Sequence, residues 1–195
     1  MEIHSSEARS LLFFPHEIDS RSRGLDLNSK FKIQNSKFPE SPPAIRVIGV
    51  GNPLAGDDGV GIAVIEELER EGVAPGVEVI DGGTGGLTLL SLMAGARAVL
   101  LVDALAMGRA PGSVAGFRYE AGVFRADGAG LSLHQAGLGE VLALAAELGE
   151  LPELFIVGIE PESLELGQGL SEPVAAALPQ AVAAVHEWLA QFPGR

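Results

Sequence analysis

From residue 45 onward, the sequence alternates between short apolar runs and longer segments with the spacing of an amphipathic helix. Five runs have the length and composition of strands: residues 45–51, 77–80, 98–103, 113–119 and 154–159. The fourth run, residues 113–119, alternates more and is typical of a strand at the edge of a sheet. Helical spacing marks residues 60–68, 87–94 and 133–148, and a C-terminal segment in which Pro179 predicts a kink or a new helix start. The alternation predicts an α/β protein, a three-layer α/β/α sandwich with a mostly parallel five-stranded sheet.

Residues 1–44 differ in composition from the rest of the chain. They hold six basic and six acidic side chains, so residues 45–195 carry the whole formal net charge of −13 with seven Arg, twenty acids and no Lys. The first segment is polar, poor in glycine and without periodicity, and such segments rarely form a core. We therefore expect a disordered extension, or sequence upstream of the true start, over residues 1–44 and one domain over residues 45–195.

Composition also excludes several classes of protein. The chain has no cysteine, which excludes disulfides, cysteine-ligated metal centres and a thiol nucleophile. Its acidity argues against nucleic acid or an anionic membrane as the main partner. Arg97 and Asp103 interrupt the most apolar stretch, so the sequence predicts no membrane-spanning segment. The first residues do not resemble a signal peptide. We expect a cytoplasmic monomer.

Acidic residues follow three of the predicted strands. Asp57 and Asp58 follow the first, Asp81 the second, and Asp103 ends the third. In a parallel sheet, ligands bind at the carboxyl ends of the strands. Asp58 has an alternative interpretation as a helix cap, and Asp81 as a turn residue. Asp103 ends the most apolar strand, where a carboxylate is costly to bury unless it is paired or bound to a cation.

His134 completes a candidate metal site. Ser132 and Gln135 have the spacing of a capping box, which places His134 in a first helical turn, where the helix dipole favours the neutral ring. A surface histidine is the alternative, and His186 fits that description better. Two carboxylates and one imidazole, from Asp58, Asp103 and His134, suit nickel, zinc or manganese.

Two other functions remain open from the residues alone. Gly49-Val50-Gly51 after a strand and Asp81 after the next resemble a dinucleotide fingerprint. However, Leu54 stands at the third glycine position, and two aspartates stand where a pyrophosphate needs positive potential. A non-catalytic metal-binding or scaffold module is the second alternative.

Five segments, in order, resemble the motifs of the hydrogenase maturation endopeptidases. They are residues 49–61 (GVGNPLAGDDGVG), 81–84 (DGGT), 101–104 (LVDA), 134–138 (HQAGL) and 157–161 (VGIEP). The resemblance covers about residues 45–192, and residues 1–44 match nothing in the family. It implies a protease that removes a C-terminal extension from the nickel–iron hydrogenase large-subunit precursor after nickel insertion.

The resemblance also implies roles for individual residues. The metal-binding positions of the family fall on Asp58, Asp103 and His134, and the metal is the nickel of the substrate, with no intrinsic cofactor. The family is classed as aspartic-type, which implies that Asp57, Asp58 or Asp103 activates water; the alternative is that the carboxylates recognise nickel. Gly82, Gly83 and Thr84 lack bulky side chains, so we expect an extended substrate tail to bind there.

Overall fold

The computed structural model describes residues 45–120, 132–133, 138–149 and 151–192. These residues all belong to one unit of the chain, residues 39–195. The predicted extension, residues 1–44, lies outside the described residues. Among those described, no helix is long and apolar enough to cross a membrane.

A mixed sheet forms the centre of the described structure. Its strands lie in the order β2-β1-β3-β6-β4. The first four are parallel and β4 is antiparallel at the edge, which confirms the predicted five-stranded, mostly parallel sheet. The bounds are β1 (Ile45–Gly49), β2 (Val77–Asp81), β3 (Ala98–Ala106), β4 (Val114–Arg118) and β6 (Glu153–Ile159).

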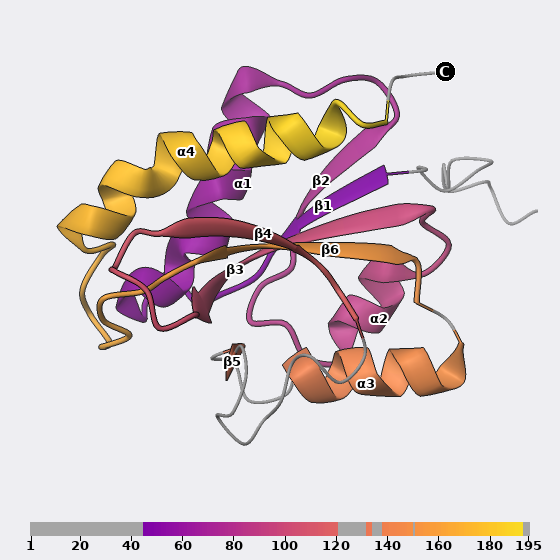
Figure 1. The fold of residues 1–195 in the computed structure, drawn as a ribbon, viewed down its shortest axis with the longest axis horizontal. Helices are drawn as coiled ribbons and strands as arrows, with labels where there is room; N and C mark the ends of the chain where they lie inside the picture. Colours follow the sequence, from indigo (N-terminus) through magenta and orange to yellow (C-terminus); the bar gives the residue numbers. More distant parts are fainter. Residues whose placement is uncertain (1–44, 121–131, 134–137, 150, 193–195) are drawn as a thin grey trace, which may run out of the picture. The chain divides into compact units, whose positions relative to one another are not determined.

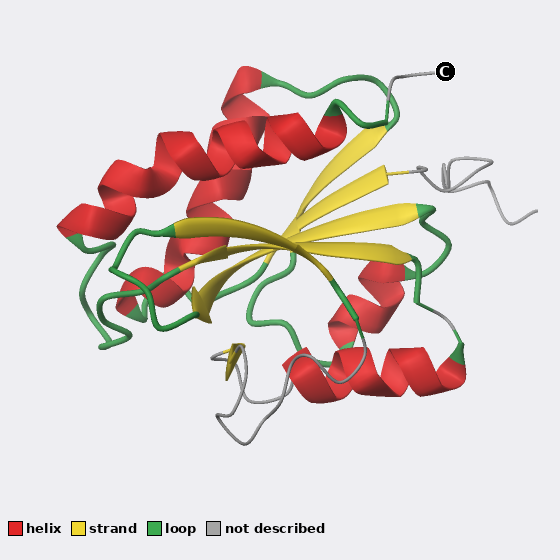
Figure 2. Ribbon diagram, viewed as in Figure 1, coloured by secondary structure: helices red, strands yellow, loops and turns green. Residues whose placement is uncertain are grey.

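Helices cover both faces of this sheet, which confirms the three-layer prediction. Helices α1 (Val60–Glu71) and α4 (Glu172–Leu189) lie on one face, and α2 (Thr88–Met93) and α3 (Leu138–Leu148) lie on the other (Figure 1). Figure 2 shows the strands between the two pairs of helices. Helix α4 runs through Pro179, so a new helix does not start there.

The apolar core has two parts, one on each face of the sheet. Strand β3 contributes to both because its successive side chains point to opposite faces. Leu100 and Val102 pack with α1 and α4, whereas Val99 and Leu101 pack on the side of α2 and α3. This central position explains why the third predicted strand is an unbroken apolar run.

The predicted helix over residues 133–148 is wrong at its start. Helix α3 begins at Leu138, and Ser132–Leu133 form a short strand, β5, that pairs antiparallel with the end of β3. Strand β3 extends to Ala106, beyond its last pair with β6 at Ala104, so its backbone is available there. This long-range pairing takes Ser132 away from the predicted helix-capping role.

Candidate functional site

The candidate site lies at the carboxyl ends of the parallel strands. Strands β1, β2, β3 and β6 run in the same direction, so the segments that follow them meet at one edge of the sheet. The prediction that Asp103 ends its strand is wrong. Asp103 lies three residues before the end of β3, beside Gly158 of β6. Asp57 and Asp58 lie in a short 3₁₀ helix, η1 (Gly56–Gly59), between β1 and α1.

Asp103 is a fully buried carboxyl group without a hydrogen-bond partner among the described residues. Its side chain is 0% exposed, and both oxygens lack a partner. Burial raises the pKa of Asp103 well above its usual value, the charge of Asp58 raises it further, and the backbone of Ala104 offsets only part of the rise. Buried polar atoms are nearly always paired, so this exception is a candidate for a bound cation.

Asp58 is the charged group beside Asp103. It is also buried, and its Oδ2 accepts a hydrogen bond from the backbone N–H of Asn52 at 2.8 Å. The N-cap of α1 is Gly59, so the alternative interpretation of Asp58 as a helix cap is wrong. The bond to Asn52 closes the loop between β1 and η1.

Glycines allow η1 and α1 to approach the strands closely. A Cβ atom on Gly51, which has a φ of +139°, would lie 1.7 Å from the carbonyl oxygen of Asp58. A Cβ atom on Gly61 would lie 2.2 Å from the carbonyl oxygen of Val50 and 2.4 Å from that of Val102. The glycines of residues 49–61 therefore provide the backbone packing that brings Asp58 to Asp103.

We expect Gly61→Ala to destabilise the protein by about 3 kcal/mol, because the new methyl group overlaps the backbone carbonyls of Val50 and Val102. Gly139→Ala is the matched control, since Gly139 is also the second residue of a helix but has nothing near its Cβ position. The control is expected to be neutral or more stable by up to about 1 kcal/mol. Urea unfolding measures both variants, and equal stabilities would contradict the packing argument.

Asp57 has a different environment from Asp58. Its carboxylate is fully buried and accepts hydrogen bonds from the backbone N–H groups of Glu162 (2.8 Å), Ser163 (3.0 Å) and Ser171 (2.6 Å), and from the Ser171 hydroxyl (2.9 Å). Burial acts to raise the pKa of Asp57, but these hydrogen bonds outweigh it and leave the pKa lowered. Asp57 is therefore an ionised group that holds the segment between β6 and α4.

The loop after β2 lies against the end of β1. Gly82 donates its N–H to the Gly49 carbonyl, and Gly83 accepts from the N–H of Gly51, both at 2.8 Å. Asp81 accepts the N–H of Gly83 through Oδ1 at 2.7 Å, as expected of a turn residue. Gly83 and Thr84 are exposed, and a Cβ on Gly83 would meet nothing within 4 Å. The loop thus presents an exposed surface at Gly83 and Thr84, next to the end of β1.

Glu160 is a site residue to which the sequence analysis assigns no role. It follows β6 and is buried, and its Oε2 accepts the N–H groups of Met107 at 2.7 Å and Arg109 at 3.1 Å. These bonds order the segment between β3 and β4. The sequence indicates a role for Glu160 only through its place in the segment 157–161. Its hydrogen-bond partners lie about fifty residues away, so local spacing does not reveal them.

His134 lies outside the described residues. The residue before it, Leu133, pairs with Leu105, two positions after Asp103 on β3. Within the described ranges, no group of three or more His, Cys, Asp or Glu residues is arranged to hold a metal ion. The structure therefore describes two of the three predicted ligands, Asp58 and Asp103, and brings these two together.

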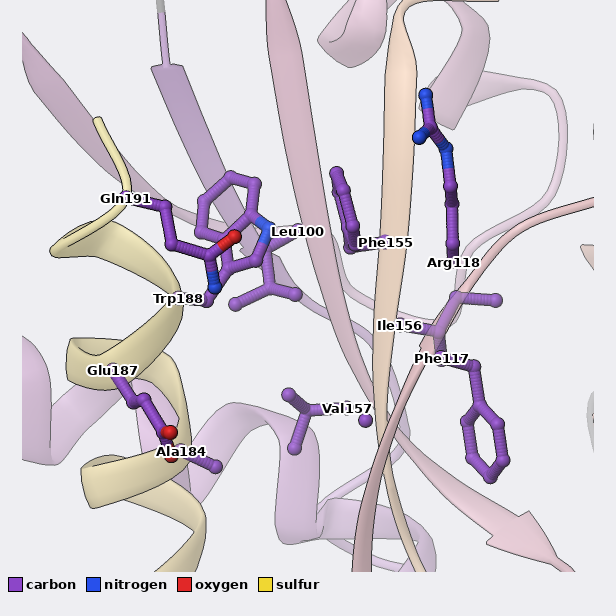
Figure 3. A pocket seen from close by; sticks show the side chains of 11 residues that line it. Leu100, Phe117, Arg118, Phe155, Ile156, Val157, Ala184, Glu187, Trp188 and Gln191 are labelled. Atoms are coloured by element: carbon purple, nitrogen blue, oxygen red, sulfur yellow. The ribbon is translucent and has the colours of Figure 1, made fainter.

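A cavity of about 310 Å³ lies apart from these carboxylates, between the last turns of α4 and the β4–β6 part of the sheet. In Figure 3, Trp188 faces Phe155 across it, with a ring-centroid distance of 5.5 Å, and Arg118 lies over the Phe155 ring. None of the predicted site residues lines this cavity. It is an aromatic packing region and not part of the candidate site.

Comparison with known proteins identifies the family. A model of the family described as hydrogenase maturation protease matches residues 62–188. The chain belongs to this family. It is 42% identical over 153 residues to the hydrogenase expression/formation protein HoxM of Azotobacter vinelandii. The aligned residues cover 76% of this chain and 73% of the relative. It is 40% identical to the hydrogenase 2 maturation protease of Escherichia coli K12, and this alignment covers 73% of this chain and 91% of the relative.

Solved structures agree with this assignment. The hydrogenase maturating endopeptidase HybD from E. coli is 36% identical, with a TM-score of 0.68 over 76% of this chain and 93% of the neighbour. The hydrogenase 2 maturation peptidase from Thaumarchaeota archaeon SCGC_AB-539-E09 is 31% identical, with a TM-score of 0.58 over 75% and 97%. The hydrogenase maturation protease family, predicted from five motifs, is thereby confirmed, in place of the dinucleotide-binding and scaffold alternatives.

Proposed function

We propose that this protein is an endopeptidase that removes the C-terminal extension of a nickel–iron hydrogenase large-subunit precursor after nickel has been inserted. Membership of the family supports the protease activity. The observation that carries the rest is Asp103, a buried carboxyl group beside Asp58 without a partner among the described residues. Such a group is suited to a substrate that brings its own cation.

We assign Asp58 and Asp103 primarily to recognition of the substrate's nickel, with His134 as the third ligand. Before a cation binds, burial and Asp58 favour the protonated form of Asp103, since both raise its pKa. Binding of nickel displaces this proton, because metal ligands are deprotonated. A precursor without nickel leaves Asp103 protonated and offers these residues no cation to bind, which gives the site a way to read whether insertion has occurred.

We assign cleavage of the tail to the same site, at Asp58 and Asp103. Nickel bound at Asp58 and Asp103 would polarise a nearby carbonyl of the substrate as a Lewis acid. Both oxygens of Asp57 already accept hydrogen bonds, which supports a positioning role for it in place of the catalytic role that the aspartic-type class implies. The exposed positions Gly83 and Thr84 support an extended substrate tail in that loop, whereas Gly82 packs against Ile48 and the Gly49 carbonyl.

Incubation of the protein with nickel-loaded and nickel-free large-subunit precursors tests this function. Mass spectrometry of the precursor is expected to show loss of the C-terminal extension only when nickel is present. Intact nickel-loaded precursor would contradict the endopeptidase activity. Equal cleavage of both precursors would contradict recognition through nickel and would leave the peptidase activity standing.

A further inference from the structure

Two highly exposed leucines lie on neighbouring loops beside the candidate site. Leu54 and Leu166 are 72% and 77% exposed, the highest values among the large hydrophobic residues of the described chain. Leu54 belongs to the loop after β1, and Leu166 to the segment after β6. The N–H of Gly167 donates to the carbonyl of Leu54 at 2.9 Å, so the two loops lie side by side.

An apolar cavity continues this surface. A hollow of about 180 Å³ opens between the same two loops and α1, and Pro53, next to Leu54 in the chain, belongs to its lining, although neither exposed leucine does. Ile62, Ala63 and Leu170 supply its other apolar side chains. Single exposed leucines are common on proteins, but two neighbouring ones beside an apolar hollow form a patch of the kind found at interaction sites.

The backbone holds this patch in place. Gly56 and Asp57 donate their N–H groups to the carbonyls of Gln168 and Ser163 at 3.1 and 2.9 Å, and the Asp57 carboxylate binds the same segment. These bonds hold the two loops that carry the leucines against each other. A preorganised surface loses little conformational entropy when a partner binds, which favours a docking role.

Acidic residues surround the patch. Glu66, Glu162 and Glu165 are exposed on α1 and on the segment after β6, and residues 45–195 contain no lysine. An apolar centre with a charged rim is the usual composition of a protein–protein interface. The complementary partner is a protein surface that offers apolar side chains flanked by Lys or Arg.

We propose that Leu54 and Leu166 form the docking surface for the folded body of the large-subunit precursor, whose tail enters the site. The argument for this partner is continuity: Leu54 lies in the loop 52–58, which Asn52 and Asp58 close through their 2.8 Å hydrogen bond. A protein docked on Leu54 is therefore adjacent to the carboxylates. The assignment rests on the proposed function, which supplies the precursor as partner.

The test compares the Leu54→Ser/Leu166→Ser double variant with wild type in binding to nickel-loaded precursor, by calorimetry, and in steady-state processing. Because both side chains are exposed, urea unfolding is expected to be unchanged. We expect the Kd and KM to rise by roughly tenfold or more, with a smaller effect on kcat. Leu148→Ser is the matched control, since Leu148 is 58% exposed at the end of α3, on the other face of the sheet, and it is expected to behave as wild type.

Each outcome separates the two proposals. An unchanged Kd and KM in the double variant, or an equal loss in Leu148→Ser, would overturn the docking surface. Wild-type protein that binds the precursor through these leucines without cleaving it would support docking and contradict the proposed function. Sedimentation of the protein alone tests the other occupant, because a dimer abolished by the double variant would make this a self-association surface and overturn the proposal.

Discussion

Asp103→Asn is expected to abolish processing of a nickel-loaded precursor, by about a thousandfold or more, because a neutral amide cannot replace a carboxylate ligand or support Lewis-acid chemistry worth several kcal/mol. The variant is expected to fold. Asp103 is 0% exposed and has no hydrogen-bond partner among the described residues, so the amide breaks no existing contact of that kind. Loss of activity in a folded protein separates a functional group from a structural one.

The same variant should be more stable than wild type at neutral pH, by about 1 kcal/mol, since asparagine stays neutral without having to take up a proton on folding. The raised pKa of Asp103 sets the sign: the native state keeps this proton at a pH where the unfolded state has lost it. Wild-type stability therefore falls as the pH rises above the usual range of a carboxyl group toward the raised pKa. The asparagine variant lacks this decline, so its advantage grows with pH.

Urea unfolding between pH 4 and 8 and mass spectrometry of the precursor check both parts of this prediction. Glu153→Gln is the matched control, because Glu153 is an exposed acid on the neighbouring strand β6. We expect it to process the precursor normally. Normal processing by Asp103→Asn would refute the site assignment, and a variant less stable than wild type across this pH range would refute the argument from burial.

Asp57→Ala is expected to lower the free energy of unfolding by about 3 kcal/mol, because it leaves several partly buried donors without their acceptor. Those donors are the backbone N–H groups of residues 162, 163 and 171. Ser171→Ala is the matched control, since it removes only the hydroxyl bond at 2.9 Å, and we expect a loss of about 1 kcal/mol. Processing should fall in Asp57→Ala because the segment that carries Leu166 loses its anchor.

The pH dependence of Asp57 has the opposite sign to that of Asp103. Its pKa is lowered in the folded protein, so its contribution to stability is present above the usual pKa of aspartate and is lost as the pH falls through the lowered value. The difference between wild type and Asp57→Ala should therefore shrink in acid. Chemical unfolding across this range measures it, and an Asp57→Ala variant no less stable than Ser171→Ala would show that the network contributes little.

Most of the fold follows from local patterns in the sequence. Apolar runs of strand length and helical periodicity are properties of neighbouring residues, and the unbroken run before Asp103 correctly predicts the central strand β3. The error at Ser132 has the same origin. Its spacing to Gln135 is a local helix signal, but Ser132 pairs with Ala106, a contact that local spacing does not contain.

The site was predicted in part for a similar reason. Asp58 and Asp103 stand out because carboxylates beside apolar strands are costly in any fold of this class, and the structure brings these two together. Asp57 and Asp58 are adjacent and chemically identical, so the sequence offers no means to separate their roles. Their roles differ because Asp57 accepts hydrogen bonds from residues more than one hundred positions away in the chain.

Sequence by itself therefore determined the family, the α/β class, the strand order along the chain and the acids that end in the site. Only the tertiary structure decided that hydrogen bonds hold Asp57, whereas both side-chain oxygens of Asp103 have no partner among the described residues. It also decided that Leu54 and Leu166 are exposed on neighbouring loops. The physical reason is that periodicity records how each segment meets the core, whereas burial, pairing and pKa depend on groups that only the folded chain brings near.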